Sequence, residues 1–161
     1  MENQVTNIES FNIGMLQTVP CIFKNFGPDD LRGILETARI ETLDEDIKLN
    51  PKSEHQTLDG YLVVEGKLAA QRHGKNIELY NPGDFIGEAF VHSRVFIDCD
   101  LVTLEPCKLL VFDRESTLYY FRDKPEKLLK IFTINVVEAQ QKHIFSLFKR
   151  IAAFMLKNEE L

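Results

Sequence analysis

The chain has 161 residues, of which 44% are hydrophobic and 27% charged, values typical of one globular domain with an appended element. Its net charge of −6 argues against non-specific nucleic-acid binding by the chain as a whole. There is no apolar run of about 18 residues and no signal-peptide pattern, so we expect neither a membrane segment nor secretion. The three cysteines lack CxxC spacing, which favours reduced thiols in a cytoplasmic protein over a metal or iron–sulfur site.

The first predicted element is an amphipathic helix over residues 29–38. It follows Pro28 and begins with two acidic residues, which suit the positive end of a helix dipole. Its apolar residues recur at helical spacing: Leu31, Ile34, Leu35 and Ala38.

Short strands are predicted from Arg39 onward, where the apolar period changes to two. Residues 61–71 form a predicted hairpin with its turn at Glu65-Gly66. Short strands at even spacing are typical of a β-sandwich or jelly roll. The predicted strand segments are 40–43, 47–49, 61–64, 67–71 and 77–80.

The stretch from Asn81 to Arg114 carries the strongest signals for a site. Pro82-Gly83-Asp84 predicts a turn, since proline presets the second position and glycine suits the third. Gly87 precedes a helix-compatible run and can leave backbone N–H groups free to bind an anion. Residues 95–111 predict two strands broken at Pro106.

Helical periodicity returns after Asp113, with a short helix predicted at 115–121 and a long one from Glu126 to about Lys157. The long helix could reach about 45 Å at 1.5 Å per residue, more than a domain of this size needs for its own core. One set of its apolar residues is predicted to pack on the β-rich part of the chain: Leu128, Ile131, Phe132 and Leu147.

A second apolar stripe on the long helix has alternating spacings of three and four residues. Such a heptad-like seam predicts a homodimer, in which Gln141 would set the register at some cost in affinity. The alternative is that this stripe also folds back on the chain's own core. The members of the seam are Ile134, Val137, Gln141, Ile144, Phe148, Ile151 and Met155.

Three segments resemble the cyclic-nucleotide-binding domain of the Crp/Fnr regulator family: YLVVEGKL at 61–68, PGDFIGE at 82–88 and LLVFDR at 109–114. The resemblance extends over nearly the whole chain, from about Leu16 to Leu156. It implies a mainly β fold with flanking helices, in which residues 1–121 form a double-stranded β-helix, or jelly roll, with a helical lead-in. Residues 122–161 would form a C-terminal dimerisation helix.

The resemblance also implies a phosphate-binding cassette that begins at Gly87. In such a cassette Glu88 would hold the ribose 2′-hydroxyl. Backbone N–H groups around Ala89 and Phe90 would face the cyclic phosphate. These residues form the predicted ligand site, with a cyclic nucleotide as the possible ligand and no other cofactor.

The predicted cassette departs from the family pattern at its phosphate arginine, because that position is Ile97 here and Asp98 follows it. An aspartate beside a phosphate costs on the order of a few kcal/mol, and the lost arginine contact adds about 1.5–3 kcal/mol. At about 1.4 kcal/mol per tenfold, micromolar affinity would become millimolar or weaker. Arg94 would replace the arginine only in a reshaped cassette.

Three functional hypotheses follow. The first is a cyclic-nucleotide-binding-like regulatory or sensor module with lost or altered ligand specificity, acting through dimerisation or a protein partner. The second is a genuine cAMP or cGMP receptor domain of a Crp-like transcription regulator that uses Arg94. The third is a small cupin-like metal enzyme.

Missing motifs weigh against some of these hypotheses. No catalytic triad is visible and the four histidines lack metal-ligand spacing, so we expect neither an enzyme nor a metal site. Crp-like regulators continue into a helix-turn-helix domain, and no recognition helix or basic patch follows the long helix here. We therefore expect no DNA binding by this chain alone.

Overall fold

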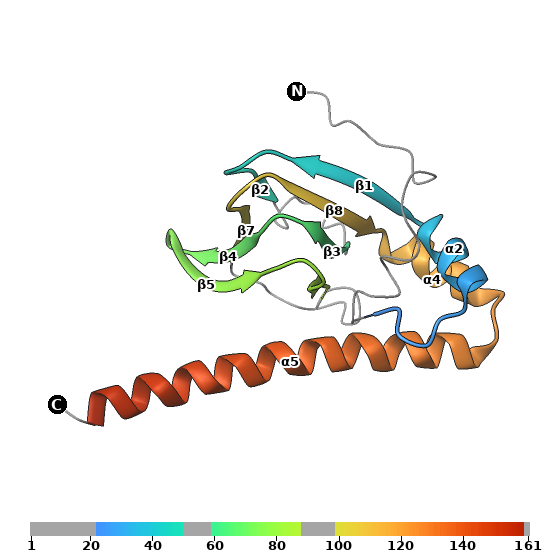
Figure 1. Ribbon diagram of the computed structural model, residues 1–161. Coiled ribbons are helices and arrows are strands. Elements are labelled where there is room, and N and C mark those ends of the chain that lie inside the picture. The colour runs from blue at the N-terminus through green and yellow to red at the C-terminus, as the bar shows by residue number, and fades with distance from the viewer. Residues whose placement is uncertain (1–21, 50–58, 88–98, 160–161) are drawn as a thin grey trace.

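The computed structural model describes residues 22–49, 59–87 and 99–159 (Figure 1). Within these ranges the chain forms eight short strands followed by two helices, with one further helix before the first strand. The elements in chain order are α2 (Pro28–Leu35), β1 (Ala38–Leu43), β2 (Lys48–Leu49), β3 (Gly60–Glu65), β4 (Leu68–Arg72), β5 (Lys75–Tyr80), β6 (Phe85–Ile86), β7 (Asp100–Thr103), β8 (Cys107–Phe112), α4 (Arg114–Arg122) and α5 (Glu126–Glu159).

The strands form two four-stranded antiparallel sheets, with the orders β1-β8-β3-β6 and β2-β7-β4-β5. Figure 1 shows α5 running along one side of these sheets and continuing past β5, while α2 and α4 lie beside its beginning. The predicted mainly β class with flanking helices and a long C-terminal helix is confirmed, and the sheet arrangement is consistent with a jelly roll.

Strand β8 lies at the centre of the first sheet and is buried on both faces, because its side chains alternate between two cores. Leu109 and Val111 point between the sheets, whereas Leu110 and Phe112 point toward the helices. The core between the sheets contains Leu43, Val63, Leu68, Ala70, Tyr80, Ile86, Leu101, Cys107, Leu109 and Val111. The core beneath the helices includes Ile22, Phe23, Leu31, Ile34, Leu62, Phe85, Phe112, Phe121, Leu128, Phe132 and Val136.

The predicted hairpin over 61–71 is wrong. Strand β3 pairs with β6 and β8, whereas β4 pairs with β5 and β7, so the chain crosses from one sheet to the other between them. Gly66 makes this crossing with a φ of 84°, packed against the backbone of Pro106 and Cys107. The local hairpin is β4–β5 instead, with His73 and Gly74 both at positive φ in its turn.

The other predicted elements differ little from the observed ones. The first helix ends at Leu35 rather than residue 38, because Ala38 already pairs with Phe112 as the first residue of β1. The break at Pro106 separates β7 from β8 as expected, and the predicted helices over 115–121 and 126–157 correspond to α4 and α5.

Substituting alanine for Gly66 and for Gly74 distinguishes the effect of backbone strain on stability from that of steric clash. Both Gly66 and Gly74 have positive φ, but a Cβ on Gly74 meets nothing within 4 Å, whereas one on Gly66 would lie 2.7 Å from the Cys107 Sγ and also overlap the Pro106 carbonyl oxygen. We expect Gly74→Ala to lower the free energy of unfolding by about 1 kcal/mol and Gly66→Ala by about 3 kcal/mol. Urea denaturation measures both, and equal losses would contradict the described crossing.

Candidate functional site

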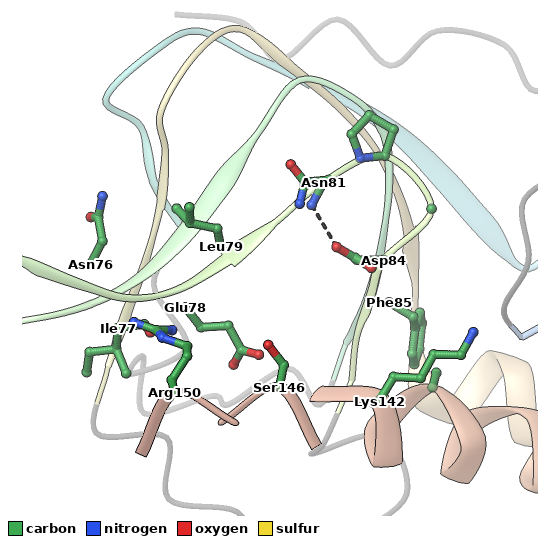
Figure 2. A pocket seen from close by; sticks show the side chains of 13 residues that line it. Asn76, Ile77, Glu78, Leu79, Asn81, Asp84, Phe85, Lys142, Ser146 and Arg150 are labelled. Carbon is green, nitrogen blue, oxygen red and sulfur yellow. Dashed lines mark hydrogen bonds between the residues drawn. The ribbon is translucent and has the colours of Figure 1, made fainter. Parts of the chain in front are cut away.

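The turn between β5 and β6 positions the start of the candidate site. Its Gly83 has a φ of 96°, and the N–H of Asp84 donates to the Asn81 carbonyl at 3.0 Å, which closes a four-residue turn. The Asp84 carboxylate accepts a second bond from the Asn81 N–H at 2.8 Å, drawn in Figure 2. The predicted turn at Pro82-Gly83-Asp84 is therefore confirmed.

Two further hydrogen bonds fix this turn to the neighbouring strand. Gly83 N–H donates to the Val63 carbonyl at 2.9 Å, and Val63 N–H donates to the Asp84 carbonyl at 3.0 Å. Strand β6 then pairs with β3 and leads directly to Gly87, which is buried. A Cβ at Gly87 would overlap the ring of Phe85, so this position suits glycine for packing reasons alone.

A cavity of about 160 Å³ lies between the sheets beside Gly87. Its polar groups are few: the Tyr80 hydroxyl donates to the Glu78 carboxylate at 3.0 Å, and Gln140 of α5 closes one side. This volume is smaller than the 300–1,000 Å³ typical of ligand pockets. The lining residues are Ala70, Ile77, Glu78, Tyr80, Phe85, Ile86, Gly87, Cys99, Leu101 and Gln140.

Gly87 is the member of the predicted cassette that the structure describes. It follows β6 directly and lies beside the cavity, and its predicted role as the start of a cassette stays a prediction. The remaining members lie outside the described residues, so their predicted roles stay predictions: Glu88, Ala89, Phe90, Arg94, Ile97 and Asp98.

A larger groove of about 580 Å³ separates β5 and its turn from α5 (Figure 2). On the helix side it is lined by Lys142, Ser146 and Arg150, which follow one another at intervals of four residues and so share one face. The Arg150 guanidinium spans the groove and donates to the carbonyl of Ile77. The opposite wall holds the carboxylates of Glu78 and Asp84. The groove is thus lined by both positively and negatively charged side chains.

The helix side of this groove was not among the predicted site residues. Lys142, Ser146 and Arg150 have the composition of an ordinary solvated helix face. The available signal was their spacing of four residues on the side of the helix opposite the apolar seam.

Helix α5 is held against the sheets by its first half. Leu128, Phe132 and Val136 are buried, as predicted for the first two, and Ile131 packs against the same core. Asn135 is also buried, and its side-chain amide donates to the carbonyls of Ile22 at 3.1 Å and Lys24 at 2.8 Å. The side chain of Leu147 lies outside the described part of the structure.

The predicted seam lies on the opposite side of α5 and is exposed in the single chain. Its apolar members are between 40% and 65% exposed, and Gln141 is exposed as well. The alternative in which this stripe folds back on the chain's own core is therefore wrong. The members concerned are Ile134, Val137, Ile144, Phe148, Ile151 and Met155.

A charged cluster on β1 and β3 has a structural explanation. Arg39 of β1 donates to Asp59, the residue that precedes β3, at 2.9 Å, which links β1 to the start of β3 across β8. Arg39 also donates to Glu41 of its own strand at 2.8 Å. The second Asp59 oxygen, Oδ1, is buried without a hydrogen-bond partner among the described residues. Burial, with the nearby Asp59 and Glu41 carboxylates, raises the pKa of Tyr61 to about 12, so this phenol stays neutral.

Two other kinds of feature, a metal site and a membrane-spanning helix, have no candidate among the residues that the structure describes. No group of three or more His, Cys, Asp or Glu side chains there is placed to hold a metal ion. None of the helices described combines the length and apolarity that a membrane crossing requires.

The comparisons with known proteins identify the fold. No family model matches the sequence, and no curated protein matches it significantly. A cyclic nucleotide-binding domain from Methylobacillus flagellatus matches with a TM-score of 0.76 at 16% identity, over 94% of this chain and 88% of that one. The catabolite activator protein of Thermus thermophilus matches with a TM-score of 0.63 at 17% identity, over 83% and 62% of the two chains.

The sensor domain of the transcriptional regulator DNR from Pseudomonas aeruginosa gives a similar result. Its TM-score is 0.60 at 19% identity, over 86% of this chain and 90% of that one. The chain thus has the fold of cyclic-nucleotide-binding domains, and the resemblance predicted from the sequence is confirmed at the level of the fold.

The buried amide of Asn135 offers a test of how α5 is anchored. Asn135→Leu leaves two carbonyls without their donor, so we expect the free energy of unfolding to fall by about 1–3 kcal/mol. Thr133→Val on the exposed side of the same turn is the matched control and should change it by less than about 0.5 kcal/mol. Thermal and urea unfolding measure both. Equal stabilities of the two variants would show that Asn135 does not anchor the helix.

Proposed function

We propose that this chain is a cyclic-nucleotide-binding-like regulatory module that acts through α5 and performs no catalysis. The observation that carries the proposal is the two-sided placement of α5. One face of this helix lines the groove and closes the cavity beside Gly87, while the opposite face carries the exposed apolar seam. A change in the pocket would therefore act on the same rigid element that contacts a partner.

The ligand of this module differs from the cyclic nucleotides, or has been lost. The sequence supports this, because it has Ile97 where the family pattern has its phosphate arginine and Asp98 at the next, usually small, position. A phosphate left without its arginine loses a charge-assisted hydrogen bond. The cytoplasm is the compartment we propose, with a second copy or another protein as the partner.

The neighbours in fold support a regulatory role over an enzymatic one. The three structures are a binding domain, an activator and a sensor domain, none of them an enzyme. The cupin-like enzyme would need a bound metal. Elemental analysis of the purified protein tests this alternative, and one metal ion per chain would favour it.

Calorimetric titration with cAMP and cGMP tests the proposed loss of ligand. We expect no heat of binding and no thermal stabilisation at millimolar nucleotide, because the phosphate has no arginine at position 97. Micromolar binding would contradict this and favour the receptor hypothesis. In that case Arg94→Ala should abolish binding, whereas an unchanged affinity would exclude Arg94 as the replacement cation.

A charge in the seam tests assembly through α5. We expect Ile144→Glu to weaken self-association by a hundredfold or more, about 3 kcal/mol, because a carboxylate would be buried in the apolar contact. Tyr119→Glu is the matched control, since Tyr119 is an exposed apolar residue on α4 at 66% exposure. Light scattering measures the mass of each. A wild type that is already monomeric would refute the proposed seam.

A further inference from the structure

The groove between β5 and α5 carries opposite charges on its two walls (Figure 2). On the helix side lie Lys142 and Arg150, which are two turns and about 12 Å apart along the axis of α5. On the opposite side lie Glu78 of β5 and Asp84 of the turn that follows this strand. We call these two sides the helix wall and the strand wall.

The charges of the two walls do not neutralise one another. Within the part of the chain that the structure describes, no ion pair includes Lys142, Arg150 or Asp84. The Arg150 guanidinium donates instead to the uncharged carbonyl of Ile77. The Asp84 carboxylate accepts the backbone N–H of Asn81. The groove therefore holds charges of both signs with which a ligand can pair.

The signs of these charges restrict the class of ligand. A simple anion would be attracted by Lys142 but repelled by Glu78 and Asp84, and a polyamine would meet the reverse arrangement. A molecule with one charge of each sign satisfies both walls, and hydrogen bonds between charged partners are about twice as strong as those between neutral ones. The groove thus suits a zwitterion better than a cyclic phosphate, which carries its charge as an anion.

Between its charged groups the groove offers amide and apolar contacts. Asn76 and Asn81 line it, and the side-chain amide of Asn81 has no hydrogen-bond partner among the described residues. Such an amide both donates and accepts, as a peptide group requires. Ile77 and Leu79 add apolar surface, and Leu79 is 49% exposed. The volume of about 580 Å³ lies within the 300–1,000 Å³ typical of small-molecule sites.

We propose that this groove binds a small molecule with an ammonium and a carboxylate group, either a free amino acid or a short peptide. The carboxylate pairs with Lys142, and the ammonium pairs with the carboxylates of the strand wall. Arg150 closes the groove at Ile77 through its bond to that carbonyl. The inference rests on the proposed function for the regulatory role of α5, and it names the class of ligand that replaces a cyclic nucleotide.

Calorimetric titration of the full chain tests the ligand class. The probes are the standard amino acids and a set of tripeptides Ala-X-Ala, at up to millimolar concentration. We expect at least one of them to bind and to raise the unfolding temperature. Acetylation of its amino group or amidation of its carboxylate should each weaken binding by about tenfold or more, because each removes one of the two charges. Binding of a free amino acid or of tripeptides alone distinguishes the two sources.

Charge-removing variants test the two walls. We expect Lys142→Gln to weaken binding of the best probe by about tenfold or more. Glu78→Gln with Asp84→Asn should do the same, since it removes both negative charges and keeps a hydrogen-bond acceptor at each position. The matched control is Lys130→Gln, because Lys130 is an exposed lysine of α5 that does not line the groove. Circular dichroism identical to that of the wild type shows that each variant is folded.

The outcomes separate this inference from the proposed function. The inference is overturned if no probe binds, if the acetylated or amidated form binds as tightly as the zwitterion, or if Lys142→Gln and Lys130→Gln bind the best probe equally well. Micromolar binding of cAMP contradicts the proposed loss of the cyclic nucleotide, whereas zwitterion binding that depends on Lys142 still supports the groove. A monomeric wild type refutes the seam and leaves the groove standing.

Discussion

A continuous cluster of phenylalanine rings joins the candidate site to the long helix, and the rest of the structure depends on it. Phe85 of β6, two residues before Gly87, lies 6.5 Å from Phe112 of β8, centroid to centroid. Phe112 contacts Phe23, which contacts Phe26, and Phe26 lies 6.4 Å from Phe132 of α5. Because protein cores are close-packed, the position of α5 and that of Gly87 are fixed by one set of contacts.

The two halves of α5 make different contacts with the rest of the chain. The first half of the helix belongs to the core through Leu128, Phe132 and Asn135, whereas the second half meets the sheets through the Arg150 bond to Ile77 and otherwise lines the groove. In the proposed regulatory module, an effect on the pocket would reach a partner through this helix, because the helix would contact both. The apolar residues on the outer face give this helix a surface to present to another chain.

The sequence predicted those features that depend on local chemistry. The turn at Pro82-Gly83-Asp84 and the extent of α5 follow from residues close together in the chain, and both are confirmed. The predicted hairpin at Glu65-Gly66 is wrong because a glycine there suits both a tight turn and a crossing between sheets. The choice depends on partners 40 or more residues away, Pro106 and Cys107. The sequence did not predict the groove, because residues such as Lys142 are typical of a solvated helix face. Only the fold shows that β5 lies opposite them.

The most direct test of the central claim, that α5 works by contacting another copy through its outer face, is site-specific cross-linking. Gln141→Cys places a thiol in the middle of the seam, where a twofold contact brings it close to its counterpart. Mild oxidation should yield a covalent dimer in high proportion, while wild type and Tyr119→Cys, at an exposed position on α4 outside the seam, should not. Cross-linking of Gln141→Cys no greater than that of these two controls would contradict the account.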